Sequence, residues 1–262
     1  MSAGLLDVLF IGDIVGRPGR DAVAHYLGEM RISGFPDLVI ANGENAAGGF
    51  GITERIYQEL RDHGIDIVTM GNHTWDKNEI FGFIQDAERL LRPLNYPEGT
   101  PGKGWTLLEV NHVKVAIINV MGRAFMPPVD CPFRTLDTAL ATIGPITPTI
   151  IVDIHAEATA EKIALARHLD GRVSACIGTH THVQTADETI FPGGCAFLSD
   201  AGMTGPRDAV IGMKTDLAIR KMRTALPTKL EVAEGPTQFN AVRMRIDAMT
   251  GKSVAIDRLN YR

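Results

Sequence analysis

Short, almost wholly apolar runs recur along the chain, and each is followed at once by a polar residue. Five of them read as buried strands: residues 5–11, 37–41, 65–70, 149–154 and 173–177. Strands that are apolar on both faces fit the interior of a sheet covered by other layers. Between them lie segments with helical spacing of apolar residues, such as Val23, Leu27 and Met30. The alternation predicts an α/β protein.

Length and composition narrow the class further. The 262 residues can bury a full core, and 45% hydrophobic with 22% charged residues is ordinary for a globular protein. No internal repeat or linker stands out, so we expect one domain over residues 1–262. The net charge of −5 argues against a general nucleic-acid or anionic-membrane binder, which would carry a basic excess. A small anionic ligand at a local site stays compatible with it.

The cysteines and the first residues bear on the compartment. Cys131, Cys176 and Cys195 form no C-x-x-C pair, which disfavours structural zinc, and so sparse a set fits a reduced, cytoplasmic chain. Residues 1–10 have no basic segment and contain Asp7, so we expect no signal peptide. No apolar run is long enough to span a bilayer, and we expect no membrane partner.

The remaining segments predict both hairpins and helices. Hairpins are expected at 105–110 with 113–120, around Asn111-His112, and at 239–246 with 253–256; short strands are expected at 188–191 and 196–198. Thr53 and Thr159 are candidate helix caps. A helix is expected to carry Ile80, Ile84 and Leu91, and a basic helix to run over 214–223.

The residues that follow the five strands share one chemistry. They are Asp13, Glu44 with Asn45, Asn72 with His73, His155, and His180 with His182. In α/β sheets, ligands gather outside the carboxyl ends of the strands, so five strand ends that each offer a ligand predict a shared metal site. If the last strand stays extended, His180 and His182 project to the same side.

The donor types indicate which metals the site takes. Carboxylate and amide oxygens combine with imidazoles, without a thiolate, which suits Mn²⁺, Fe or Zn²⁺. Seven protein ligands are too many for one ion that keeps an open position. They suit two ions bridged by a carboxylate, for which Glu44 is the central candidate. We therefore predict that one ion is held by Asp13, Glu44, Asn45 and His182, and the other by Glu44, Asn72, His155 and His180.

A two-metal site indicates the chemistry. Such a pair activates a bridging hydroxide for in-line attack at phosphorus, as phosphodiester hydrolysis requires. The leaving oxygen needs a proton donor. His73 is the spare histidine beside a ligand, and imidazole exchanges protons in the right range. We predict a metal-dependent phosphodiesterase with His73 as its general acid.

These motifs also resemble a known group. Gly12-Asp13, Gly43-Glu44-Asn45, Gly71-Asn72-His73, His155 and Gly178-x-His180-x-His182 look like the ordered motifs of the calcineurin-like metallophosphoesterases. That superfamily implies an αββα sandwich of two mixed β-sheets flanked by helices. The chain departs from its pattern at Val15, where a histidine is usual, and at Glu44, where an aspartate is usual. Asn45 then stands in for the missing imidazole.

Longer strings narrow the resemblance to one family. Gly12 to Gly16, Asn42 to Ala46, Gly71 to Trp75 and Gly202 to Gly205 are similar to the bacterial YmdB-like proteins, and the similarity runs nearly end to end. That family implies 2′,3′-cyclic-nucleotide 2′-phosphodiesterase activity, which releases the 3′-nucleotide, with an iron or manganese pair. The partner expected is then a small nucleotide or phosphodiester, with no sequence-specific nucleic acid.

Substrate contacts are less constrained by the sequence. Trp75 lies in a ligand-bearing loop and either belongs to the core or walls the site. Phe125, beside prolines, either packs in its loop or stacks on a base. Arg123 is the candidate phosphate contact in the same loop. The sequence leaves the oligomeric state open, and a homo-oligomer is compatible with it.

Two alternatives remain at this stage. A dinuclear amide or ring hydrolase would use a similar ligand set, although the His-x-His of such barrels comes at the first strand, whereas here it comes late. A nucleotide- or metal-binding regulatory protein would need no turnover at all. A complete ligand set argues against a site that has lost its activity.

Overall fold

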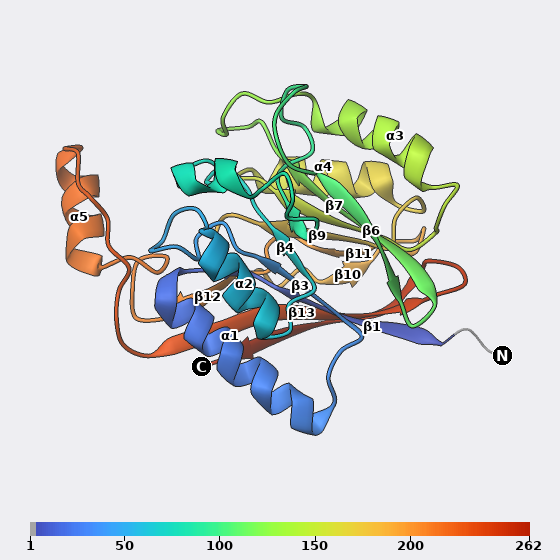
Figure 1. Ribbon diagram of the computed structural model, residues 1–262, viewed down its shortest axis with the longest axis horizontal. Helices are drawn as coiled ribbons and strands as arrows, with labels where there is room; N and C mark the ends of the chain where they lie inside the picture. Colours follow the sequence, from blue (N-terminus) through green and yellow to red (C-terminus); the bar gives the residue numbers. More distant parts are fainter. Residues whose placement is uncertain (1–3) are drawn as a thin grey trace.

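The fold consists of two mixed β-sheets packed face to face between helices (Figure 1). The computed structural model describes residues 4–262, so residues 1–3 of the segment expected to lack a signal peptide lie outside the described part of the chain. Among the described residues, no helix is both long and apolar enough to cross a membrane.

The first sheet has eight strands, in the order β2-β12-β13-β1-β3-β4-β5, with β14 also paired to β13. The neighbouring strands β1, β3, β4 and β5 pair in parallel. Strand β13 is antiparallel to β1, β12 and β14. The strands are β1 Leu5–Ile11, β2 Asp13–Ile14, β3 Leu38–Asn42, β4 Ile67–Thr69, β5 Leu90–Leu91, β12 Met203–Pro206, β13 Thr237–Asp247 and β14 Ser253–Tyr261.

The second sheet has six strands in the order β10-β11-β9-β8-β7-β6. Its inner strands β7, β8, β9 and β11 are parallel, and both edge strands are antiparallel to their neighbours. The strands are β6 Trp105–Val110, β7 Val113–Met121, β8 Ile150–His155, β9 Ala175–Thr179, β10 Thr189–Ile190 and β11 Ala196–Leu198. Both sheets are mixed, as expected.

Four helices cover the outer faces of the two sheets. Helices α1 Gly16–Ser33 and α2 Glu54–Asp62 pack on the first sheet, and α3 Pro132–Ile143 and α4 Thr159–Leu169 pack on the second. The fifth helix, α5 Thr215–Thr224, stands away from both sheets (Figure 1), and Ala218 is its one buried residue.

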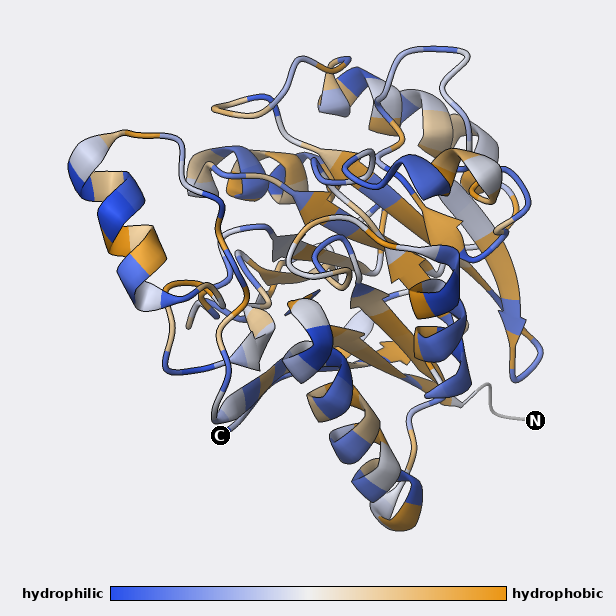
Figure 2. Cartoon of the chain, turned by 60° about the vertical axis from the view of Figure 1, so that its left-hand side comes forward, coloured by the Kyte–Doolittle hydropathy of each residue, from blue (hydrophilic) through white to orange (hydrophobic). Residues whose placement is uncertain are grey.

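Strand β1 shows how the sequence builds these layers. Leu9 and Ile11 pack in the cluster with α1 and α2, whereas the alternate residues Val8 and Phe10 pack in the cluster between the sheets. Successive side chains of a strand point to opposite faces of the sheet. A strand that is apolar throughout therefore contributes side chains to the hydrophobic clusters on both faces. Figure 2 shows the result: the strands are hydrophobic, and the helices have one polar side. The predicted αββα sandwich is confirmed.

The predicted hairpins and one of the two caps are confirmed. β6 and β7 pair around Asn111 and His112, which both have positive φ, as a two-residue hairpin turn requires. The Thr53 hydroxyl accepts a hydrogen bond from the Ile56 amide at 3.3 Å and caps α2. The expected cap at Thr159 is wrong by one residue, because Ala158 precedes the helix and Thr159 is its first residue.

Three expectations about elements need correction. The helix expected from Ile80 to Leu91 is a short 3-10 helix, η1 Asn78–Gly82, followed by turns and β5. Leu90 and Leu91 pair with Val68 and Thr69 and extend the first sheet. The spacing of apolar residues within one segment cannot predict such a contact with a distant strand. β9 lies two residues later than expected, and residues 203–206, where no strand was expected, form β12 between β2 and β13.

The interface between the sheets gives a stability prediction. Phe10 is fully buried there, so Phe10→Ala should lower the free energy of unfolding by about 3–5 kcal/mol, through lost burial and the cavity left behind. Leu5→Ala is the control in the same strand, because Leu5 is 52% exposed and should change stability by less than about 1 kcal/mol. Urea unfolding of both variants measures the difference. A loss for Phe10→Ala no larger than that of the control would contradict this packing.

Candidate metal centre

The seven predicted ligands meet where parallel strands of both sheets end. Asp13 begins β2 just after β1, and Glu44 and Asn45 follow β3. Asn72 follows β4 after a two-residue gap, and His155 ends β8. His180 and His182 follow β9. Because these strands run parallel within each sheet, their carboxyl ends lie at one edge, which brings together residues up to 169 positions apart in the sequence (182 − 13).

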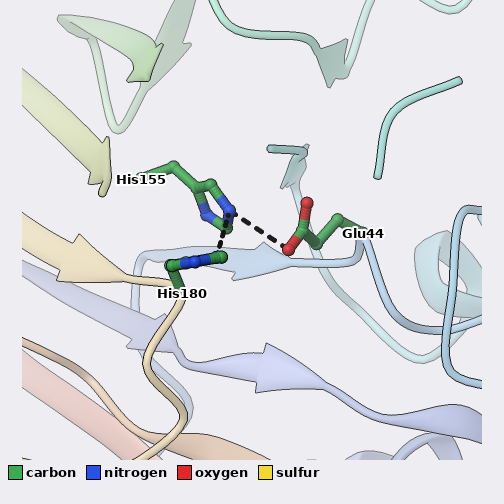
Figure 3. Close-up of side chains that lie close together, drawn as sticks. All are labelled: Glu44, His155 and His180. Carbon is green, nitrogen blue, oxygen red and sulfur yellow. Dashed lines mark hydrogen bonds and ion pairs between the residues drawn. The ribbon is translucent and has the colours of Figure 1, made fainter. Parts of the chain in front are cut away.

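One group of four is centred on the His155 Nε2 atom. It lies 3.1 Å from Glu44 Oε1, 2.9 Å from Asn72 Oδ1 and 3.1 Å from His180 Nδ1. Figure 3 shows the imidazoles of His155 and His180 and the carboxylate of Glu44 converging from separate elements. One ligand atom from each of these three residues lies within 4.8 Å of the others, a spacing that can hold a metal ion.

The other group of four is centred on the His182 Nε2 atom. It lies 3.8 Å from Asp13 Oδ1 and 3.2 Å from Asn45 Nδ2, and that amide nitrogen is 3.4 Å from Glu44 Oε1. Asn45 therefore presents its amide nitrogen where a metal would need the oxygen. The two ends of an amide have nearly the same shape, so a half-turn about its last bond exchanges them. Glu44 Oε1 contacts both groups, as a bridging carboxylate must.

Each imidazole has an oxygen atom within 3.2 Å of its second nitrogen, on the side away from the centre. His155 Nδ1 is 2.9 Å from Thr179 Oγ1, whose hydroxyl donates to Asp153 Oδ1 at 2.8 Å and therefore accepts from His155. His182 Nδ1 donates to the Ile211 carbonyl at 3.1 Å. His180 Nε2 is 3.2 Å from a Glu157 carboxylate oxygen.

These outer partners fix the imidazole tautomers. A proton on the outward nitrogen leaves a lone pair on the inward one, which is the form that binds metal. All three inward nitrogens face the Glu44 and Asp13 carboxylates. The donor set therefore has the chemistry of a metal centre.

The backbone at His180 and His182 differs from the extended geometry expected for them. Their φ angles are +97° and +67°, a region that residues other than glycine rarely adopt. The two rings therefore converge on the centre because β9 stops at Thr179 and the chain turns sharply, and not by strand alternation. Backbone strain of this kind persists where surrounding contacts enforce it and is concentrated at functional sites.

The charge balance of the centre favours a cation. Asp13 and Glu44 are almost fully buried, and Asp13 Oδ1 has no hydrogen-bond partner. Burial raises the pKa of Asp13, and the nearby His182 and His155 offset only part of that rise. A buried carboxylate oxygen without a donor is costly unless a positive charge faces it. The residues present therefore fit a metal, and this orphaned oxygen is the observation that favours one.

A proton takes the place of a cation in the metal-free centre. Burial opposes a charged imidazole, but the Glu44 carboxylate, with Asp13 and Asp153 nearby, raises the pKa of His155 to about 9. Burial likewise opposes the Glu44 charge, yet His155 and the His73 amide lower the pKa of Glu44 to about 2. Burial and the neighbouring His155 charge lower the pKa of His180 to about 3. His155 is thus the predicted ligand that would have to lose a proton for a metal to bind.

His73 lies beside this centre with its side chain directed by another carboxylate. Its amide donates to Glu44 Oε2 at 2.9 Å, and its Nδ1 is 2.7 Å from Asp76 Oδ2. An Asp76 carboxylate on Nδ1 leaves Nε2 as the nitrogen that can exchange a proton with a bound molecule. The His73 side chain is partly exposed, and the residue lines a cavity of about 290 Å³ beside the centre.

The three residues predicted to contact substrate do not line this cavity. Trp75 stacks on Phe81 at 5.3 Å and meets the Tyr96 ring edge-on at 5.6 Å. Phe125 is 93% exposed, and the Arg123 amide donates to Glu161 while the residue stays exposed. Substrate contact by Trp75, Arg123 and Phe125 stays a prediction. The cavity is lined by Glu44, Asn45, Gly49, Phe50, His73, Glu157, His180, Thr181, His182, Ile211, Met213 and Leu230.

Several residues of the site were missed from the sequence. Asp76 lies three residues after His73 in the sequence, and Glu157 lies two residues after His155. This short spacing was the sequence signal that could have identified both as site residues. No sequence signal identified Ile211 and Phe50, because an apolar residue in a loop can serve packing, binding or neither. The buried Lys162–Asp200 ion pair, at 2.8 Å, was also missed; Asp200 Oδ2 accepts from the Thr181 amide and hydroxyl and so fixes the residue between the two histidines.

Comparison with known proteins places the chain in a family. The sequence pattern of the YmdB-like protein family matches residues 9–259. The chain belongs to the YmdB-like family. It is 52% identical over 252 residues to a protein of Bacillus subtilis (strain 168) named 2′,3′-cyclic-nucleotide 2′-phosphodiesterase, and the match covers 96% of each chain. The resemblance drawn from the motifs is confirmed.

Solved structures of similar proteins share the fold of this YmdB-like chain over nearly its whole length. A hypothetical protein from Thermus thermophilus is 44% identical with a TM-score of 0.92, covering 98% of this chain and 99% of its own. A phosphatase from Mycoplasma pneumoniae is 32% identical with a TM-score of 0.92, covering 98% and 94%.

The His155 proton gives the first prediction for the centre. Below pH 9 a binding metal must displace this proton, so Mn²⁺ affinity should rise with pH by up to about tenfold per unit and level off near the His155 pKa of about 9. Calorimetric titration of metal-free protein at pH 6.5, 7.5 and 8.5 measures this rise. Titration in two buffers of different ionisation enthalpy should also show proton release. An affinity that is flat over this range would rule out His155 as a ligand.

Gly71 gives the second prediction, because the site leaves no room for a side chain there. A Cβ at this position would lie 2.2 Å from His155 Nε2 and 2.5 Å from Glu44 Oε2. Gly71→Ala should therefore displace both groups and weaken metal binding by roughly 10–100-fold. Gly28→Ala is the control, since nothing lies within 4 Å of that position. Metal content after dialysis and circular dichroism distinguish a lost site from a lost fold; normal metal content in Gly71→Ala would be the contrary result.

Proposed function

We propose that this protein is a metal-dependent phosphodiesterase that hydrolyses nucleoside 2′,3′-cyclic phosphates to 3′-nucleotides. The observation that carries this proposal is the gathering of six ligand-type side chains around the buried Glu44, next to a cavity lined by His73. The name of the 52% identical relative supports the substrate class. The fold that the chain shares with a phosphatase structure supports phosphorus chemistry.

We assign Asp13, Glu44, Asn45 and His182 to one metal ion, and Glu44, Asn72, His155 and His180 to the other. Iron or manganese fits this donor set best, and zinc is compatible with it. When bound, such a pair supplies Lewis acidity toward phosphate oxygens and an activated water as nucleophile. The outer partners Thr179, Glu157 and the Ile211 carbonyl hold the three imidazoles in the form that binds metal.

The chain's own acid is His73. Hydrolysis adds a water oxygen to phosphorus and breaks the bond between phosphorus and O2′, and O2′ must then take up a proton to become a hydroxyl. His73 Nε2 is the nitrogen left available for this transfer, because Asp76 occupies Nδ1 at 2.7 Å. Asp76 thereby positions the ring for this transfer.

The test combines metal analysis with a substrate screen. Protein purified without chelator should contain close to two transition-metal ions per chain, and it should turn over 2′,3′-cyclic AMP and bis-p-nitrophenyl phosphate. Chelation should abolish that turnover, and added Mn²⁺ should restore it. Hydrolysis of dihydropyrimidines without action on either phosphodiester would instead identify an amide or ring hydrolase. Tight nucleotide binding with no turnover would indicate a regulatory protein.

His73→Ala should reduce kcat by roughly 10²–10⁴-fold while the metal content stays near that of the unmodified protein, because the variant removes a proton donor and no ligand. Asp76→Asn should give a smaller loss, since the ring stays but its orienting charge is removed. The decisive comparison uses a substrate whose leaving group needs no proton. With p-nitrophenolate as leaving group the loss in His73→Ala should shrink, and an undiminished loss would show that His73 is not the acid.

A further inference from the structure

The cavity beside the centre has two chemically different halves. The half at the strand ends carries the carboxylate, amide and imidazole groups already described. The other half is lined by Gly49, Phe50, Ile211, Met213 and Leu230, none of which has a polar side chain. These residues come from two segments, the loop after β3 and the segment around α5. The metal centre does not account for an apolar wall so close to it.

The loop that carries Phe50 is held against the centre. The Gly49 amide donates to the Asn45 carbonyl at 3.1 Å, and the Ala47 amide donates to the Gly51 carbonyl at 2.9 Å. Gly49 and Gly51 have φ angles of +96° and +73°, so the chain folds back on itself on both sides of Phe50. The half-buried Phe50 ring packs edge-on against the His73 imidazole, with 4.9 Å between ring centroids.

The second segment of the wall, which packs beside Gly49, is also fixed to the centre. Val210 and Met213 exchange backbone hydrogen bonds of 3.0 and 2.9 Å around a tight turn, in which Ile211 and Gly212 have φ angles of +46° and +89°. A β-branched residue in this conformation is strained. Its carbonyl accepts the His182 Nδ1 hydrogen bond, and its side chain is half exposed in the cavity wall. The turn thus fixes a metal-binding histidine and an apolar contact together.

The chemistry of the substrate indicates what meets this wall. The inference rests on the proposed function, in which His73 protonates O2′ of the ribose. In a nucleoside 2′,3′-cyclic phosphate, O2′ is bonded to C2′, and the neighbouring C1′ carries the nucleobase. Apart from the phosphate, which is bonded to O2′ itself, the base is therefore the part of the nucleotide outside the ribose ring that lies nearest to the proton donor. Because Phe50 touches His73, Phe50 is also the aromatic ring nearest to the expected position of the base.

We propose that Phe50, together with Ile211, Met213 and Leu230, forms a nucleobase subsite that binds by stacking and apolar contact. None of these side chains carries a hydrogen-bond donor or a strong acceptor for a base edge, and every base has an aromatic face. The subsite therefore accepts all four bases, and purines, which stack over a larger area, bind more tightly than pyrimidines. The polar half of the cavity takes the phosphate, and the apolar half orients the nucleotide so that O2′ faces His73.

The test compares a nucleotide with its base-free counterpart. The unmodified protein should hydrolyse 2′,3′-cyclic AMP with a higher kcat/KM than 1-O-methylribose 2,3-cyclic phosphate. Phe50→Ala should lower that ratio by roughly 5–150-fold, the range expected for one base–aromatic stack. Phe50→Trp should restore it. Phe35→Ala is the matched control and should leave the ratio unchanged, because Phe35 precedes β3 at the opposite edge of the sheet and is 37% exposed.

Each other outcome has a defined meaning. An equal loss on both substrates in Phe50→Ala would show that Phe50 acts through His73 or the loop, and would overturn the subsite. A more than tenfold preference for one base within a size class would overturn recognition without edge contacts. If the unmodified protein turns over neither substrate, the proposed function fails. Calorimetry then tests the subsite separately, by measuring the affinity of the Mn²⁺-loaded protein for adenosine 3′-phosphate and for ribose 3-phosphate. If adenosine 3′-phosphate binds no tighter than ribose 3-phosphate, the subsite is overturned.

Discussion

The burial of two carboxylates, Asp13 and Glu44, where the two sheets meet is the constraint on which the rest of the site depends. No lysine or arginine within the described chain pairs with either of them, and both are removed from solvent. Such charges are tolerable only with protons, imidazoles or metal ions beside them. The position of three histidines around them, each with an oxygen within 3.2 Å of its outer nitrogen, follows from that requirement.

A buried polar network joins the sheets behind these ligands. Asp153 on β8 accepts from Thr69 on β4 at 2.5 Å and from Thr179 on β9 at 2.8 Å, and Thr179 in turn contacts His155. A hydroxyl from one sheet and a carboxylate from the other thus fix the relative position of the two sheets at the site. Burial raises the pKa of Asp153 to about 6, the cost of placing this carboxyl in the interior. A fully hydrogen-bonded network of this kind specifies one arrangement more sharply than apolar packing does.

Much of this arrangement could be predicted from the sequence, because strands buried on both faces have an unmistakable composition. Once the strands are assigned, the polar residue after each strand is expected at the same edge of the sheet. The sequence alone therefore predicted that Asp13, Glu44 and His155 lie close together. Local pattern could not reveal what depends on distant pairing. Leu90 and Leu91 form a strand because β4 lies beside them, and residues 203–206 because β2 and β13 do. The wall formed by Phe50, Met213 and Leu230 joins loops some 180 residues apart (230 − 50), so no local window contains it.

The origin of the ligands in both sheets has a consequence for the stability of the whole molecule. Asp13, Glu44 and Asn72 belong to the first sheet's strand ends, and His155 and His180 to the second's. In the proposed metal-loaded form, ions held between them would act as a non-covalent cross-link across the sandwich. Because the unfolded chain cannot assemble such a set, each tenfold rise in free metal above the dissociation constant adds about 1.4 kcal/mol to the stability of the folded state for each ion. The stability of the metal-loaded fold would therefore depend by mass action on the concentration of free transition metal.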